Sequence, residues 1–239
     1  MKRIMMKKVL KLLAILAVLG FPMAVIGFRL NLFPFSVSGQ LIRYTLFLSA
    51  GVFLVGMLIS FVKRKDTDLA KTARTSAMIA LLPLIGIGTQ IFVGMSVPRI
   101  HNISTDTVNP PKFDKVVSLR SESHNSLEYN TEKLASEQSQ AYPKVKTLVS
   151  DMTLSDAHAK AKSVIESMGL ALVNSDSEKG IIEATETTAI WGFKDDVVVR
   201  MVEKDGKTII DLRSVSRIGQ SDLGANAKRI ETFLAKFGN

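Results

Sequence analysis

The sequence predicts a mixed α+β protein in two parts, in which three transmembrane helices precede a soluble domain built on an antiparallel sheet. Three observations support this fold class. Three long apolar stretches occupy residues 1–97, the Lys and Arg residues beside them alternate in number, and residues 144–239 show strand-like runs between two segments of helical spacing.

The apolar stretches fit membrane spans at about 9–28, 44–62 and 76–97. A bilayer core requires roughly 20 residues of helix, with about 17 as a lower limit. The basic tail before the first stretch is also typical of a cleaved signal peptide. Because no A-x-A site follows and the apolar run continues through Pro22 to Phe28, we expect a retained helix.

The basic residues that flank the spans predict the orientation of the chain. The N-terminal tail has five Lys or Arg, the loop after the first span has two, Arg29 and Arg43, and the next loop again has five. Cytoplasmic loops carry the excess of Lys and Arg. We therefore expect a bacterial inner membrane protein with a cytoplasmic N-terminus, with the bilayer as partner, and with everything after Val97 in the periplasm.

Charge and composition exclude several classes of function. Residues 1–97 hold 12 of the 31 Lys and Arg and two of the 22 acids, so the soluble part is near neutrality and lacks the basic surface that nucleic acid requires. The chain has no cysteine, and its histidines, His101, His124 and His158, form no H-x-x-x-H pair. We predict no metal and no cofactor, and periodicity places His158 on the exposed side of its helix.

The soluble part divides into a connector and a folded domain. Residues 98–143 are polar and contain Asn109-Pro110-Pro111, which predicts an extended connector that wraps on the domain. Residues 144–239 predict a β-α-β-β-β-β-α domain, with Asp205-Gly206 as a hairpin turn and Asp222 as the cap of the last helix. The expected strands are Val145–Met152, Leu170–Asn174, Gly180–Thr187, Asp196–Glu203 and Lys207–Arg217.

Both helices should pack on one face of this sheet, which leaves the other face polar. Alternation in the last strand points Ile210 and Leu212 to the helices. The candidate ligand-binding residues are those of the polar face together with one residue of the connector, namely Arg200, Asp211, Arg213, Arg217 and Asp106. Three interpretations stay open: a solvated face with cross-strand ion pairs, which we favour, a groove for an anionic or carboxylate ligand, or a face covered by the connector as an internal clamp.

We assign no catalytic residue. Ser221 lies in Gly219-Gln220-Ser221-Asp222-Leu223-Gly224, but a nucleophile elbow requires G-x-S-x-G, and here the second glycine is displaced by one position. Asp195 and Asp196 are adjacent on a strand, so they should face opposite sides of the sheet and not share a metal ion.

Several motifs of the soluble half resemble one family. They are Ile100-His101-Asn102-Ile103-Ser104-Thr105-Asp106, Asn109-Pro110-Pro111, Ala141-Tyr142-Pro143, residues 183–188, residues 191–200 and residues 213–226. In order and without large gaps, they resemble the family catalogued as domain of unknown function 1499, over residues 97–237. The resemblance implies the identity of the domain and no activity.

These observations favour a non-catalytic binding or assembly module of the cell envelope, with envelope proteins or an anionic ligand as partner. The alternative is an envelope enzyme that acts on a carboxylated or glycan-like substrate at the Arg-rich sheet face. It predicts a pocket that gathers Asp106, Arg200, Arg213 and an acid. The pairs Gly20/Ala24 and Gly56/Ser60 would let helices approach closely, within the chain or in a homo-oligomer.

Overall fold

A computed structural model describes residues 1–238, which form two compact units that divide between Val93 and Gly94. The first unit holds α1 (Lys2–Arg29), α2 (Phe35–Val62) and most of α3 (Thr67–Ser96). All three helices are long and apolar enough to cross a membrane. The first two predicted spans lie inside α1 and α2, and the third ends one residue beyond α3. Each helix begins before its predicted span.

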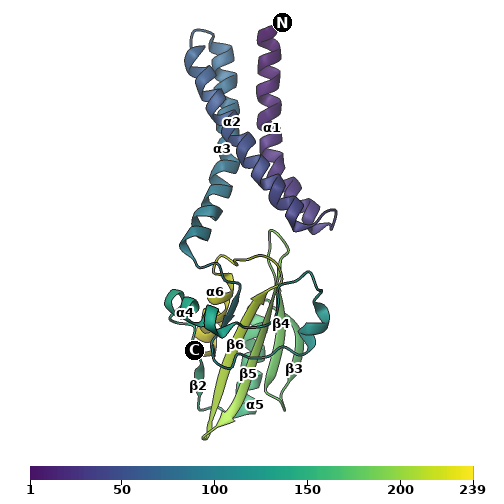
Figure 1. The fold of residues 1–239 in the computed structure, drawn as a ribbon, viewed down its shortest axis with the longest axis vertical. Helices are drawn as coiled ribbons and strands as arrows, with labels where there is room; N and C mark the ends of the chain where they lie inside the picture. The colour runs from purple at the N-terminus through teal and green to yellow at the C-terminus, as the bar shows by residue number, and fades with distance from the viewer. Residues whose placement is uncertain (239) are drawn as a thin grey trace. The chain divides into compact units, whose positions relative to one another are not determined.

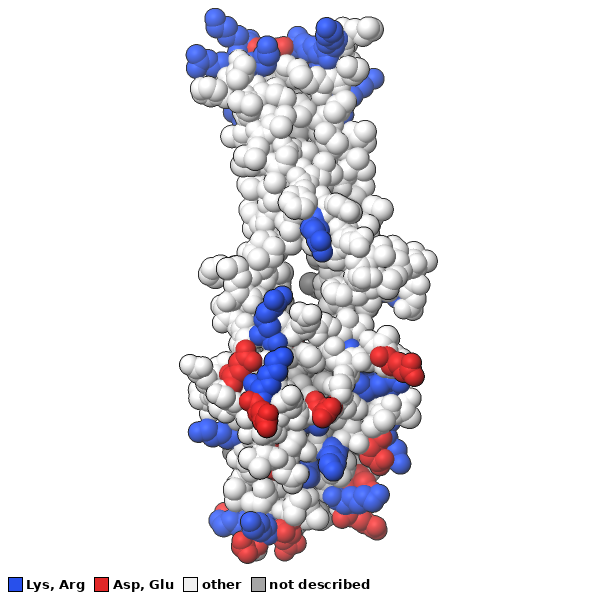
Figure 2. Space-filling model, viewed as in Figure 1, with Lys and Arg blue, Asp and Glu red and all other residues white. Residues whose placement is uncertain are grey.

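The helices of the first unit pack through small residues and turn their large apolar residues outward. Ala14, Ala17, Gly20, Ala24 and Gly27 are buried on α1, while Leu, Ile and Met side chains of the same helix are exposed. This is the arrangement expected when lipid is the solvent, because small residues let helix backbones approach each other. Figure 2 shows the surface over the helices as almost uncharged, with Lys and Arg gathered at one end. At that end Arg3 pairs with Asp66 at 2.6 Å.

Two glycines mark the closest approaches between these helices. A Cβ atom on Gly20 would lie 2.0 Å from Thr45 Oγ1, and one on Gly56 would lie 2.8 Å from the backbone oxygen of Ala73. The expected close approach at Gly20/Ala24 and at Gly56 therefore occurs within one chain, between α1 and α2 and between α2 and α3.

Gly56→Leu is expected to destabilise the helix bundle, because the backbone of α3 cannot move away as a side chain can. Gly51→Leu is the matched control on the same helix, since no atom lies within 4 Å of a Cβ placed there. Thermal unfolding of the full-length protein in detergent micelles compares the two. Equal melting temperatures for the two variants would contradict the packing described here.

The second unit is a sheet of six antiparallel strands with four helices. The strands are β1 (Asn102–Ser104), β2 (Leu148–Ser150), β3 (Ala171–Asp176), β4 (Ile181–Thr187), β5 (Lys194–Lys204) and β6 (Lys207–Ser216), in the order β1-β6-β5-β4-β3, with β2 also paired to β6. The helices are η1 (Lys115–Leu119), α4 (Thr131–Ala141), α5 (Leu154–Ser167) and α6 (Ala225–Gly238). From β2 to α6 this is the predicted β-α-β-β-β-β-α order, and the α+β class is confirmed.

Residues 98–143, expected as an extended connector, contain regular elements. β1, η1 and α4 lie in this stretch, and it belongs to the same compact unit as the sheet. The strand has three residues and η1 has five, and the buried residue of the 11-residue α4 is the polar Gln138. These elements give too few periodic apolar positions for sequence patterns to show.

Local sequence signals act as expected. Asp205 and Gly206 both have positive φ, 53° and 71°, as a two-residue hairpin turn of the primed type requires. The Asp222 carboxylate accepts hydrogen bonds from the N–H groups of Gly224 and Asn226 at the start of α6.

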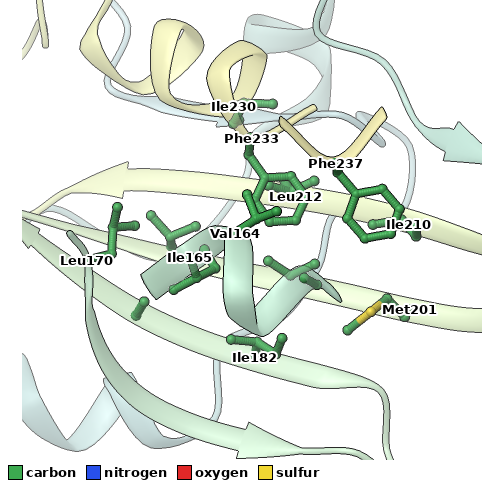
Figure 3. Close-up of a cluster of buried hydrophobic side chains, with 14 of the residues drawn as sticks. Val164, Ile165, Leu170, Ile182, Met201, Ile210, Leu212, Ile230, Phe233 and Phe237 are labelled. Carbon is green, nitrogen blue, oxygen red and sulfur yellow. The ribbon is translucent and has the colours of Figure 1, made fainter. Parts of the chain in front are cut away.

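The hydrophobic core lies between the sheet and the helices α5 and α6. Figure 3 shows Ile165 of α5 and Phe233 of α6 directed toward the strands, with Phe233 stacked beside Phe237 at 5.9 Å between ring centroids. The buried strand residues of this core are Ile103, Ile182, Ala184, Val197, Val199, Met201, Ile210 and Leu212. His158 is also buried on α5, and its Nε2 lies 3.4 Å from Ser175 Oγ of β3, so its expected exposure is wrong.

Candidate functional site

The second face of the sheet is covered by the chain itself. Residues 105–130, which we name the cover segment, run from the end of β1 to the start of α4. Figure 1 shows this teal stretch crossing one side of the strands, with α5 and α6 on the other. Arg213 is 3% exposed and Arg217 is 6% exposed, so the expectation of a solvated face is wrong. The third interpretation, in which the connector covers the face as an internal clamp, describes this arrangement.

Asp196 is the centre of one buried cluster on this face. Its two carboxylate oxygens accept hydrogen bonds from Arg217 Nε and Nη2 at 2.9 and 2.8 Å, and a third comes from Thr185 Oγ1 at 2.8 Å. Arg120 of the cover segment donates to the same carboxylate. Bidentate pairing of this kind fixes the orientation of the guanidinium relative to the carboxylate and also adds stabilising energy. Arg217 Nη1 also donates to the carbonyl of Leu119, so the cluster attaches the cover segment to β5 and β6.

Burial raises the pKa of the Asp196 carboxyl, but the hydrogen bonds from Arg217 and Thr185 outweigh burial, and the net pKa is below its usual range. A carboxyl with a lowered pKa in the folded state contributes stability above its unfolded pKa of about 3.9. That contribution is lost as the pH falls through the lower, folded pKa.

Asp196→Asn is therefore expected to lower the free energy of unfolding most at neutral pH. As the pH falls well below about 4, the difference from the wild-type protein should shrink, because Asp196 itself becomes protonated. Urea unfolding between pH 7 and pH 2, followed by the emission of Trp191, the single tryptophan of the chain, measures this difference. A difference that does not change with pH would contradict the role given to the charge.

Arg213 is held without a carboxylate among its hydrogen-bond partners. Its Nε donates to Asn102 Oδ1 at 3.0 Å, Nη1 donates to the carbonyl of Pro111 at 3.1 Å, and Nη2 donates to that of Leu127. The rings of Phe113 and Tyr129 lie 5.5 and 5.7 Å from the guanidinium carbon. Burial lowers the pKa of Arg213 to about 10, so the group keeps its charge at neutral pH.

Glu183 of β4 is the third attachment of the cover segment. It is fully buried and accepts hydrogen bonds from the backbone N–H groups of Asp114, Lys115 and Val116, at 2.7, 2.8 and 3.3 Å. Asp114 immediately precedes η1, and Lys115 and Val116 carry the first N–H groups of η1, which no bond within the helix satisfies. Asn174 Nδ2 donates a fourth bond at 3.1 Å. The carboxylate thus acts as a helix cap supplied from the sheet.

A fourth cluster joins Arg200 to two carboxylates. Arg200 Nη2 lies 3.0 Å from Asp106 Oδ2 and 2.8 Å from Asp211 Oδ2. Thr105 and Thr147 donate to the other oxygen of Asp211, at 2.9 and 2.6 Å. The side chains of Arg200 and Asp106 are 19% and 25% exposed, so this cluster reaches solvent.

The structure brings together three of the five predicted site residues. Arg200, Asp211 and Asp106 form one cluster, whereas Arg213 and Arg217 bind separate partners in the cover segment and on neighbouring strands. The donors of the arginines that were candidates for ligand binding are used by carbonyls and carboxylates of the chain itself.

The helix face of the sheet carries a further charge network that the sequence analysis missed. Arg229 of α6 pairs with Asp195 at 2.7 Å and with Glu186, and its Nη1 donates to Ser214 Oγ at 2.8 Å. Asp195 and Asp196 face opposite sides, as predicted. A signal was present in the sequence, because Arg229 falls on the apolar stripe of α6 beside Ile230, where a charge indicates a buried pair.

An open cavity of about 370 Å³ lies on this helix face, not at the Arg200 cluster. Its lining includes Glu186, Lys228, Arg229 and Lys236. Within residues 1–238, no group of three or more His, Asp or Glu side chains is placed to hold a metal ion.

The domain described above matches a known family model over residues 102–237, from the first residue of β1 into α6. The description of that family is protein of unknown function (DUF1499). The chain belongs to this family. The DUF1499 match includes the whole cover segment and begins after the three apolar helices. No curated protein matches the chain.

Proposed function

We propose that this DUF1499 protein is anchored in a bacterial inner membrane by three helices and that its domain works in the periplasm as a non-catalytic binding or assembly module. The charge distribution supports the orientation. Five basic residues precede the first span, two lie between the first and second, and five lie between the second and third. Ion pairs join the two basic segments at one end of the helices, for example Lys7 with Asp68 at 2.6 Å.

The occupied sheet face is the observation that carries the functional part of the proposal. Arg213 and Arg217 are buried, and their donors bind the cover segment and Asp196. A substrate would have to displace those contacts to reach them. The charged residues therefore support a rigid domain that acts through its outer surface, and they weigh against an enzyme that uses this face.

Fusion proteins test the orientation. Alkaline phosphatase, which requires export to become active, is fused after Asn239 and, as a control, in the turn between α2 and α3 after Lys65. We expect an active C-terminal fusion and an inactive control. An inactive but well-expressed C-terminal fusion would overturn the periplasmic placement.

Crosslinking in intact cells tests the binding or assembly role. A photo-reactive amino acid is placed at exposed apolar strand positions, Val149, Leu172 and Val202, one at a time. We expect at least one position to give an adduct with an envelope protein or with a second copy of the chain. The absence of any protein adduct at all three positions would contradict the proposal.

A further inference from the structure

The loop between β4 and β5 presents apolar side chains at its tip. Its sequence is Thr188-Ala189-Ile190-Trp191-Gly192-Phe193. Ile190 is 61% exposed, and Trp191 and Phe193 are partly buried. The rings of the two aromatic residues stack with centroids 5.5 Å apart and an interplanar angle of 2°. A short loop is normally polar. A compact group of one aliphatic and two aromatic side chains in such a position indicates an interaction surface.

Hydrogen bonds within the loop give this tip a fixed shape. The Thr188 N–H donates to the Phe193 carbonyl at 2.8 Å, and the Gly192 N–H donates to the Thr188 carbonyl at 2.9 Å. The Phe193 N–H binds Thr188 Oγ1, also at 2.9 Å. Gly192 has a φ of 70°, which favours glycine. The apolar group is thus pre-organised, so little conformational entropy is lost when it binds.

The loop lies at the end of the sheet where the chain enters from α3. The last pair of the β4–β5 hairpin is Thr187 with Lys194. The carbonyl of Lys194 accepts from the Arg217 N–H, and the neighbouring Ser216 N–H donates to the His101 carbonyl, both at 2.9 Å. His101 immediately precedes β1. His101, where the chain enters the sheet, is therefore two strand spacings, about 10 Å, from Lys194 at the base of the loop.

The link between α3 and β1 is short. α3 ends at Ser96 and β1 begins at Asn102, so even a fully extended link holds this end of the sheet within about 20 Å of the end of the helix. The link is also partly fixed, because Ile100 is 2% exposed and Val97 lies beside Gly224. If α3 spans a bilayer, the loop is within reach of the surface of that bilayer.

We propose that the loop 188–193 inserts into the lipid interface of the membrane that α3 spans. The inference rests on the membrane anchoring proposed above. Tryptophan is enriched at this depth, since its ring is apolar and its N–H can bind headgroups, and Ile190 adds apolar area. Lys194 directly follows the loop, and Arg99 lies in the link between α3 and β1. Both are exposed and would meet anionic headgroups there. The occupant is therefore lipid.

The single tryptophan makes the proposal directly testable. The full-length protein is reconstituted into vesicles of phosphatidylcholine and phosphatidylglycerol, with lipids brominated just below the headgroups, about 5–10 Å deep. We expect Trp191 emission to be shifted to shorter wavelength, to lose intensity in the brominated vesicles, and to resist quenching by aqueous iodide.

Quenching by iodide without quenching by bromine would overturn the proposal, because Trp191 would then lie in water. Protection from both quenchers would also overturn it, since Trp191 would then be buried against protein, either another part of this chain or a partner. Ile190→Ser/Phe193→Ser keeps the reporter and is expected to weaken bromine quenching. Val202→Ser, at an exposed position on the β5–β6 hairpin, is the matched control and should leave the quenching unchanged.

Quenching by lipid does not depend on which side of the membrane the domain occupies. An active alkaline phosphatase fusion with an unquenched Trp191 would overturn the loop proposal alone. An inactive fusion with a quenched Trp191 would overturn the periplasmic placement alone.

Discussion

Asp196→Ala is expected to lower the free energy of unfolding of the domain by about 3–5 kcal/mol, because it leaves two buried guanidinium groups without their shared anion. The side chains of Arg120 and Arg217 are 6% and 7% exposed, so water cannot replace the carboxylate at full strength. Urea unfolding of the full-length protein in detergent measures the change, with the emission of Trp191 as the reporter of the domain.

Asp151→Ala provides the matched control. Asp151 also pairs with a cation, Lys207 at 2.8 Å, but its side chain is 88% exposed. Water screens such a pair, and we expect almost no change in stability. If both variants lose the same stability, the buried cluster does not hold the fold in the way described. A double variant, Asp196→Ala with Arg217→Ala, should cost less than the sum of the single changes, because the two residues share one interaction.

Arg213→Met is expected to loosen the cover segment and to lower stability by several kcal/mol. Methionine keeps much of the apolar stem between Phe113 and Tyr129 but donates no hydrogen bond. The acceptors on Asn102, Pro111 and Leu127 would then be buried without a donor, at about 1–3 kcal/mol for each group that stays unsatisfied.

Limited proteolysis measures the local part of this effect. Cleavage of the Arg213→Met protein should appear first within residues 105–130, before the sheet is cut, because local opening precedes global unfolding. Lys204→Met, at an exposed position near the β5–β6 turn, is the control and should retain the wild-type pattern. First cleavage at another site would contradict the clamp role of Arg213.

The sequence was sufficient to predict the elements that carry strong periodic signals. The alternation of Ile210 and Leu212 with Asp211 and Arg213 identified the two faces of β6 correctly, and Asp205-Gly206 identified its hairpin. These signals are local, since a strand face or a turn is specified by residues close together in the chain.

The partners of the charged side chains on this face could not be predicted from local sequence patterns. Arg213 binds carbonyl oxygens of Pro111 and Leu127, and Glu183 binds three backbone N–H groups. Backbone groups are present at every residue, so no side-chain pattern marks which of them will meet a distant arginine or carboxylate. Asp106 was the one candidate residue that the sequence indicated outside the sheet, and it contacts Arg200.

The position of β1 has a consequence for how the domain forms. β1 and the cover segment are made early, but their partners on β6 follow about a hundred residues later, as in the bond from Arg213 to Asn102 with a sequence separation of 111. Long-range pairing of this kind slows folding, because a large loop must close, and lose conformational entropy, before any favourable contact compensates for that loss. During synthesis the first-made strand is therefore among the last to find its place. Until β6 emerges, residues 102–130 depend on other protection against aggregation and proteolysis.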